Sequence, residues 1–206
     1  MNPLLDNTTL FSLMRTLQNA RKIVIMGHRG PDGDALGAAL GWAEYLQGLG
    51  KSAIVVMPNP FPDFLRWLPN SEKVVFYDHK RDVARHLIEG TDLICMLDFN
   101  SLHRLQEMGD VVANSKAERL MIDHHLSPDT TCAQTIISHP EMSSTSELVF
   151  RLIYQLGGYE TMTTQGASAL YCGMMTDTGG FTYNSNNPEI YTIISKLLEK
   201  GIDKDK

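Results

Sequence analysis

Short runs rich in apolar residues alternate with amphipathic segments along most of the chain. The apolar runs predict strands at residues 22–26, 53–57, 74–77, 93–97 and 120–122. Apolar residues at helical spacing predict helices at 10–17, 35–49, 80–89 and 102–112. Continuous apolar strands separated by helices are typical of a parallel sheet that is buried on both faces. The pattern therefore predicts an α/β fold, with a doubly wound, mainly parallel, Rossmann-like sheet flanked by helices over about residues 20–125.

The pattern becomes mainly helical after residue 140. One more strand is predicted within residues 131–138, and Ser144 to Glu147 matches the S-x-x-E capping box that begins a helix. Helices are expected at 147–157, 165–176 and 188–200, and a short strand at 181–183. We therefore expect one domain over residues 1–200, with a helical continuation at 140–200. Residues 201–206 are expected to begin a linker.

Composition limits the class of protein. With 206 residues, 43% hydrophobic and 20% charged, the chain is not of the disordered type. No apolar run approaches the roughly 20 residues that a membrane helix needs, and no secretory signal is evident at the N-terminus. We expect a cytoplasmic protein without a membrane partner. Its three cysteines share no CxxC spacing and are expected to be reduced core residues: Cys95, Cys132 and Cys172.

The formal net charge of −6 argues against a protein that grips nucleic acid through a basic surface over the whole chain. If the substrate is a phosphate ester, another group must offset its negative charge. Divalent metal ions are the obvious candidates.

Asp and His residues follow several of the predicted strands. In open α/β sheets, ligands bind beyond the carboxyl ends of the strands, so these side chains are expected to meet at one edge. They are His28, Asp32 and Asp34 after the first strand, Asp98 after the fourth, Asp123, His124 and His125 after the fifth, and Asp177 after a later apolar helix.

Taken singly, most of these residues have simpler interpretations. His28 could be a surface histidine, Asp32 part of a turn, Asp98 a helix cap and Asp177 part of a helix end. Their convergence on one edge favours metal binding, because carboxylates held together repel one another unless cations lie between them. Carboxylate and imidazole ligands without thiolate suit Mn²⁺ best, with Mg²⁺, Co²⁺ or Zn²⁺ as alternatives. Two divalent ions would reduce the net charge from −6 to −2 and form a clamp for attack at phosphorus.

The motifs together resemble those of the DHH phosphoesterase family, which belongs to the RecJ-like superfamily. The pattern H-x-x-P-D-x-D stands at residues 28–34, and an Asp closes an apolar strand at Asp98, followed by Arg104. The triplet that names the family stands at residues 123–125, and the last motif contains Asp177. The resemblance covers about residues 20–185.

The resemblance implies a division of roles among these residues. His28 and Asp32 would hold one Mn²⁺ ion, and Asp98 would bridge it to a second. The second ion would be held by Asp34, His124 and Asp177. His125 would act beside the substrate phosphate and Asp123 would support it, so that a metal-bound hydroxide attacks phosphorus.

Three residues are weaker candidates for contact with substrate. Ser144 lies in a serine-rich helix start whose N–H groups could receive phosphate, although a plain helix cap is an alternative. Arg29 and Arg104 lie next to or near motif residues and could reach a phosphate.

The resemblance is greatest to the branch that degrades short RNAs and dephosphorylates 3′-phosphoadenosine 5′-phosphate. Hydrolysis of cyclic or linear dinucleotides is the main alternative, and a manganese pyrophosphatase is a minor one. A catalytically silent binding module and a structural zinc protein are alternatives of other classes. Family members usually carry a C-terminal substrate-binding domain, and no such segment is evident here. We therefore expect this chain to be part of a longer protein, and to bind its metals but be slow or inactive by itself. We leave a homodimer open.

Overall fold

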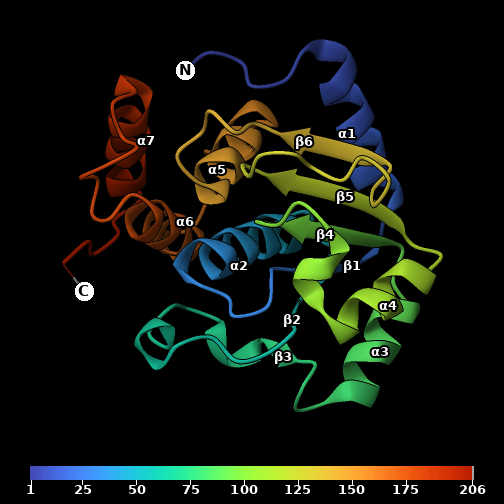
Figure 1. Ribbon diagram of the computed structural model, residues 1–206. Helices are drawn as coiled ribbons and strands as arrows, with labels where there is room; N and C mark the ends of the chain where they lie inside the picture. The colour runs from blue at the N-terminus through green and yellow to red at the C-terminus, as the bar shows by residue number, and fades with distance from the viewer. Residues whose placement is uncertain (206) are drawn as a thin grey trace.

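A computed structural model describes residues 1–205 and contains one six-stranded sheet (Figure 1). The strands are Lys22–Met26 (β1), Ser52–Met57 (β2), Val75–Phe76 (β3), Leu93–Leu97 (β4), Glu118–Asp123 (β5) and Thr135–Ser138 (β6). Their order is β3-β2-β1-β4-β5-β6, and every neighbouring pair is parallel. The prediction of a doubly wound parallel sheet is confirmed, and the sixth strand occupies the end of the predicted 131–138 segment.

Helices cover both faces of the sheet. They are Asn7–Asn19 (α1), Gly33–Gly48 (α2), Arg81–Glu89 (α3), Glu107–Asn114 (α4), Thr145–Gln155 (α5), Thr164–Asp177 (α6) and Pro188–Glu199 (α7). Ile23 and Ile25 of β1 face a core formed with α1, α2, α5, α6 and α7, whereas Val24 and Met26 face a core formed with α3 and α4. This alternation explains why the strands are apolar at successive positions.

The helices α2 and α6 approach each other closely along their small residues. A Cβ atom at Gly37 would overlap the carbonyl oxygen of Ala169, and one at Gly41 would lie 2.6 Å from the Leu170 side chain. The small residues that follow the first motif therefore let α6 lie against α2. This packing brings Asp177, the last residue of α6, to the carboxyl edge of the sheet.

Two local predictions are wrong. Residues 181–183 form turns rather than a strand, because Gly179, Gly180 and Phe181 all have positive φ. The helix predicted at 102–112 is divided into a 3₁₀ segment, Leu102–Leu105, and α4, since Gln106 also has positive φ (51°).

Other expectations concern the cysteines, membrane segments and the C-terminus. All three cysteines are buried and free, as predicted. Within residues 1–205, no helix is both long and apolar enough to cross a bilayer. Of the predicted linker, Lys206 lies outside the described residues.

The chain changes direction across the sheet between β1 and β4. From β1 it proceeds through β2 to β3 on one side, and from β4 through β5 to β6 on the other. The carboxyl ends of β1 and β4 therefore mark the point of the sheet beside which α/β proteins bind ligands. His28 follows β1 and Asp98 follows β4, so both lie at this point.

Candidate metal centre

The structure brings all six predicted metal ligands together at the carboxyl edge of the sheet. Three overlapping groups have one ligand atom from each residue within 4.8 Å of the others. They are His28 with Asp32 and Asp98, Asp34 with His124 and Asp177, and Asp98 with His124 and His125. We name the first the His28 cluster, and the second together with Asp98, whose Oδ1 lies 3.6 Å from His124 Nε2, the His124 cluster. Their function as metal ligands stays a prediction.

The His28 cluster lies between the end of β1 and the start of α2. His28 Nε2 lies 3.5 Å from Asp98 Oδ2 and 3.7 Å from Asp32 Oδ2. The other ring nitrogen, Nδ1, is 2.9 Å from the carbonyl oxygen of Arg29, which can only accept a hydrogen bond. Nδ1 therefore carries the proton, and in the neutral ring the lone pair of Nε2 faces the carboxylates.

Asp32 has two separate roles. Its Oδ1 accepts hydrogen bonds from the backbone N–H groups of Asp34 and Ala35, which caps α2. Its Oδ2 faces His28. One carboxylate can thus serve both in the turn expected at Asp32 and as the candidate metal ligand, because each function uses a different oxygen.

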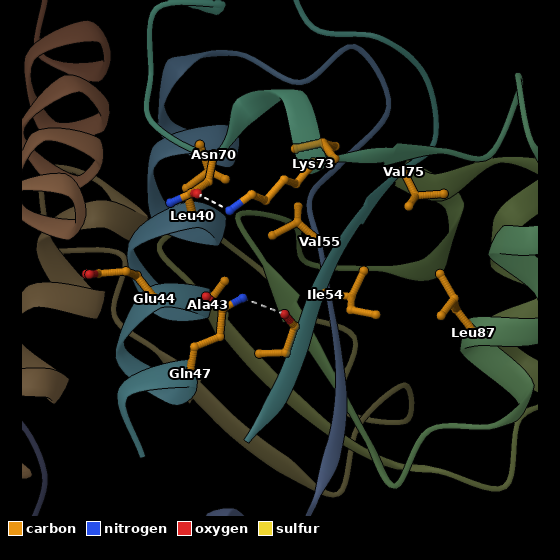
Figure 2. Close-up of a pocket in the computed structure, with 12 residues that line it drawn as sticks. Leu40, Ala43, Glu44, Gln47, Ile54, Val55, Asn70, Lys73, Val75 and Leu87 are labelled. Carbon is orange, nitrogen blue, oxygen red and sulfur yellow. Dashed lines mark hydrogen bonds between the residues drawn. The ribbon is translucent and has the colours of Figure 1, made fainter. Parts of the chain in front are cut away.

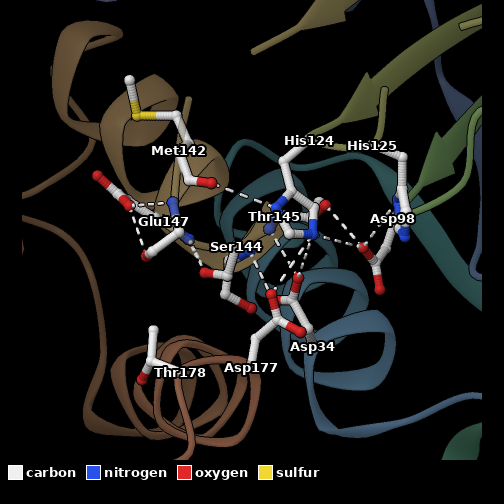
Figure 3. A network of polar contacts seen from close by, with 12 residues as sticks. Asp34, Asp98, His124, His125, Met142, Ser144, Thr145, Glu147, Asp177 and Thr178 are labelled. Atoms are coloured by element: carbon white, nitrogen blue, oxygen red, sulfur yellow. Dashed lines mark hydrogen bonds and ion pairs between the residues drawn. The ribbon is translucent and has the colours of Figure 1, made fainter. Parts of the chain in front are cut away.

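In the His124 cluster, too, a histidine nitrogen faces several carboxylates (Figure 3). His124 Nε2 lies 3.4 Å from Asp177 Oδ2, 3.6 Å from Asp98 Oδ1 and 3.9 Å from Asp34 Oδ2. Its Nδ1 donates to the carbonyl oxygen of Met142 at 3.3 Å. As at His28, a backbone carbonyl orients the ring so that Nε2 faces carboxylates.

Asp98 belongs to both clusters. Its Oδ2 faces His28 and its Oδ1 faces His124. The residue is buried, with 2% of its surface exposed, and its backbone is left-handed, with φ at 64°. A non-glycine residue in this region is strained, and such strain persists only where the surrounding structure imposes it.

The first turn of α5 donates hydrogen bonds to the carboxylates of Asp34 and Asp98. The backbone N–H of Thr145 donates to Asp34 Oδ2 at 2.6 Å, and that of Ser146 donates to Asp34 Oδ1 at 2.8 Å. The Thr145 hydroxyl donates to Asp98 Oδ1 at 3.0 Å. Asp34 is therefore held at a helix N-terminus, where negative charge is favoured.

These contacts correct the expectation for Ser144. The residue is fully buried, and its hydroxyl accepts a hydrogen bond from the Glu147 N–H as the cap of α5. The N–H groups of the two following residues are bound to Asp34 and are not free to receive a substrate phosphate. The predicted capping box is present, but the N–H groups of Thr145 and Ser146 bind Asp34, and Thr145 is a site residue that the motifs did not indicate.

Burial and the neighbouring charged groups shift the pKa values of several site residues. Burial, together with the charges of Asp98 and Asp177, raises the pKa of Asp34 well above its ordinary value. Burial and Asp98 raise the pKa of Asp177 to about 6, although His124 opposes the shift. Burial lowers the pKa of His28, but hydrogen bonds to Asp32 and Asp98 outweigh it and raise the pKa to about 10. Without other cations, the site thus retains protons to reduce repulsion.

The residues present fit a pair of divalent cations. Carboxylate oxygens and imidazole nitrogens form both clusters, and both histidines have their second nitrogen fixed by a carbonyl. A cation between Nε2 and the carboxylates would replace the protons that the clusters otherwise need. Asp98 is placed to serve both ions.

His125 is oriented by a buried carboxylate. Its Nδ1 lies 2.7 Å from Asp123 Oδ1, and Asp123 is fully buried at the end of β5. The hydrogen bond to Asp123 raises the pKa of His125, against the effect of burial. The His125 side chain is 39% exposed, so it can reach a substrate that lies over the clusters.

In the part of the chain that the structure describes, the two candidate arginines differ in whether they are paired with a carboxylate. Arg29 is paired with Asp78, with 2.9 Å between Nη2 and Oδ2. Arg104 is exposed, and its positive charge is near enough to lower the pKa of His125. The Arg29 N–H donates to the carbonyl oxygen of Arg104 at 2.8 Å, which joins the two loops.

A separate cavity of about 320 Å³ lies between the later turns of α2, β2 and the segment before β3 (Figure 2). Its wall is mainly apolar and includes Leu40, Val55 and Leu87. Lys73 at its rim is hydrogen-bonded to Asn70. None of the candidate site residues lines this cavity, so it is distinct from the metal centre.

Residues 22–174 match the model of the DHH family, N-terminal domain. The chain belongs to the DHH family. This match confirms the resemblance to the DHH phosphoesterases that the four motifs indicated. The matched segment contains five of the six predicted metal ligands, and Asp177 follows it directly.

Curated relatives and a solved structure extend this comparison. The chain is 31% identical to the bifunctional oligoribonuclease and PAP phosphatase NrnA of Thermus thermophilus, over 87% of this chain and 50% of the relative. It is 28% identical to the cyclic-di-AMP phosphodiesterase GdpP of Geobacillus thermodenitrificans, over 93% of this chain and 30% of the relative. A crystal structure of an exopolyphosphatase-related protein from Bacteroides fragilis is 50% identical, with a TM-score of 0.97, over all of this chain and 60% of that one. This DHH chain thus spans half or less of these two curated relatives.

Proposed function

We propose that this DHH protein is a metal-dependent phosphoesterase that hydrolyses short oligoribonucleotides, 3′-phosphoadenosine 5′-phosphate, or both. The observation that carries the proposal is the placement of Asp98, whose two carboxylate oxygens face two separate His and Asp clusters. A carboxylate shared by two such clusters would hold two ions close together, and a pair of neighbouring ions is the arrangement that two-metal phosphoesterases use.

Each cluster would hold one cation. His28 and Asp32 would bind the first, while Asp34, His124 and Asp177 would bind the second, and Asp98 would bind both. Mn²⁺ suits these ligands best, and Mg²⁺ or Co²⁺ is an alternative. When bound, the ions supply positive charge to the phosphoryl oxygens and to the attacking water.

The chain's own residues would manage orientation and protons. With Nδ1 held by Asp123, His125 would turn Nε2 toward a bound substrate, where it can donate a proton to the leaving oxygen. Arg104, exposed near His125, would contact a substrate phosphate. Arg29 would do so only after leaving Asp78, which makes it the weaker candidate.

The substrate class is supported by the similarity to NrnA, whose name includes both activities. Hydrolysis of cyclic or linear dinucleotides is the second candidate, and the 28% identity to GdpP favours it. Because this chain spans half or less of these relatives, a further substrate-binding domain is part of the proposal. A homodimer and a cytoplasmic location stay predictions.

Mn²⁺-dependent hydrolysis tests the proposal. Purified chain, and a form extended past Lys206, would be incubated with di- to pentanucleotide RNA, 3′-phosphoadenosine 5′-phosphate and cyclic dinucleotides. Release of mononucleotide or phosphate that requires Mn²⁺ and is lost in Asp98→Ala supports the first function. Hydrolysis that is confined to cyclic or linear dinucleotides supports the second function. Binding of two ions and substrate without hydrolysis in either form would instead indicate a silent binding module.

A further inference from the structure

Thr145, the first residue of α5, contacts one carboxylate of the His124 cluster and the carboxylate shared by both clusters. Its N–H donates to Asp34 Oδ2 at 2.6 Å and its hydroxyl donates to Asp98 Oδ1 at 3.0 Å. Thr145 is fully buried. Thr145 itself lies outside the DHH motifs from which the site was predicted.

We infer that Thr145 is a positioning residue of the metal centre, whose hydroxyl fixes the Asp98 carboxylate so that one oxygen faces each cluster. The inference rests on the proposed function, because it assigns a role toward the two ions. Thr145 would not bind an ion itself. It would act through Asp98.

The division of the two Asp98 oxygens needs such a constraint. Rotation about the bond to the carboxylate is soft, so the backbone alone does not fix the plane of the carboxylate, and one oxygen need not face each cluster. The Thr145 hydroxyl occupies a lone pair of Oδ1, the oxygen that faces His124 Nε2 at 3.6 Å. Oδ2 is then left toward His28 Nε2, at 3.5 Å. Apart from the site histidines, Thr145 is the hydrogen-bond donor to this carboxylate among residues 1–205.

Thr145 is itself held firmly. Ser144 caps α5 through the Glu147 N–H, and Glu147 Oε2 accepts from both the N–H and the hydroxyl of Ser143, at 2.8 and 2.6 Å. Arg151 binds the other oxygen of Glu147, at 2.9 Å from Nε and 2.7 Å from Nη2. A side chain anchored by a buried network can orient a ligand without moving, which is the usual role of groups behind a metal ligand.

The test compares Thr145→Val with Thr145→Ser. Each metal-free variant is titrated with Mn²⁺, and binding is measured by calorimetry and by electron paramagnetic resonance. Valine keeps the shape and the backbone N–H but removes the hydroxyl, whereas serine keeps the hydroxyl. We expect Mn²⁺ affinity to fall by about 10–100-fold in Thr145→Val and to stay near that of the unmodified chain in Thr145→Ser.

Thr16→Val is a matched control. The Thr16 hydroxyl also donates to a carboxylate, Glu118 Oε1 at 2.8 Å, but Glu118 begins β5 at the opposite edge of the sheet. We expect its Mn²⁺ affinity to be unchanged, and circular dichroism would verify that all three variants fold. Unchanged affinity in Thr145→Val, or an equal loss in Thr145→Ser, would overturn the role of Thr145. If the unmodified chain binds no Mn²⁺, the proposed function fails, and this role fails with it.

Discussion

Asp123 Oδ1 lies 2.7 Å from Nδ1 of His125, two residues along the chain. Asp123 ends β5 and is fully buried, whereas His125 is 39% exposed. The backbone of Asp123 is also fixed, because its carbonyl accepts from the His139 N–H at 3.0 Å. The imidazole is therefore held from inside the protein, while the ring remains partly exposed at the protein surface.

If His125 transfers a proton during hydrolysis, replacing its partner should impair turnover but not metal binding. We expect Asp123→Asn to lower kcat by about 10²–10⁴-fold, the usual contribution of a positioned acid or base. KM and the Mn²⁺ content should change little, since Asp123 is outside both metal clusters. Asp110→Asn, an exposed change on α4, is the matched control. Full turnover by Asp123→Asn would contradict the role assigned to the pair.

The two clusters predict a different metal content for each ligand variant. We expect His28→Ala to retain one Mn²⁺ ion, bound in the His124 cluster, and Asp177→Asn to retain one ion in the His28 cluster. Asp98→Ala should retain none, because one oxygen of Asp98 faces His28 and the other faces His124. Elemental analysis after gel filtration measures the ratio of Mn to protein. Two ions in Asp98→Ala would refute the shared carboxylate.

The sequence was sufficient for the sheet and for the convergence of the clusters. Continuous apolar runs indicated parallel strands, and the carboxyl ends of such strands meet at one edge, so His28, Asp98 and His124 were expected together. The contact of Thr145 with Asp98 was not predictable in this way. It joins residues 47 positions apart and depends on how α5 packs against the sheet edge. A capping box shows where a helix begins, but not which group its N–H groups will meet.

Gly173 on α6 lies against the α5 turn that holds Asp34. A Cβ atom at this position would lie 2.7 Å from Ser146 Cβ and 2.9 Å from Asp34 Oδ1, closer than side chains tolerate. An exchange of glycine for alanine inside a helix normally stabilises by about 0.5–1 kcal/mol. We expect the opposite sign for Gly173→Ala, a destabilisation of about 1–3 kcal/mol from overpacking, with weaker Mn²⁺ binding.

Gly48→Ala on α2 is the control for this prediction, because a Cβ atom there would meet nothing within 4 Å. Urea unfolding of both variants without metal gives the two free energies. Equal effects of the two substitutions would show that the packing around Gly173 can relax.

Arg151 is buried beside Glu147, with side chains that are 4% and 1% exposed. Removing one partner of such a pair leaves an uncompensated buried charge. We therefore expect Arg151→Met to lower the free energy of unfolding by about 3–5 kcal/mol at neutral pH. Arg81→Met, which removes a half-exposed partner of Glu107, should cost less than about 1 kcal/mol. Similar losses of unfolding free energy in the two variants would show that burial does not determine the cost of removing the arginine.

Glu189 of α7 extends this network to the surface and makes it sensitive to pH. Its Oε2 lies 2.6 Å from Arg151 Nη1, and this hydrogen bond holds the pKa of Glu189 below its ordinary value of 4.5. A carboxylate whose pKa is lowered by folding stabilises the protein fully above its unfolded pKa, and the contribution is lost as pH falls through the folded pKa. We expect Glu189→Gln to reduce stability by about 1 kcal/mol at neutral pH, because the pair is partly exposed. Below pH 4.5 the difference should shrink progressively toward zero, since protonation makes the native side chain resemble the amide. Urea unfolding across this range, without metal, measures the difference, and one that is independent of pH would show that the ion pair does not contribute.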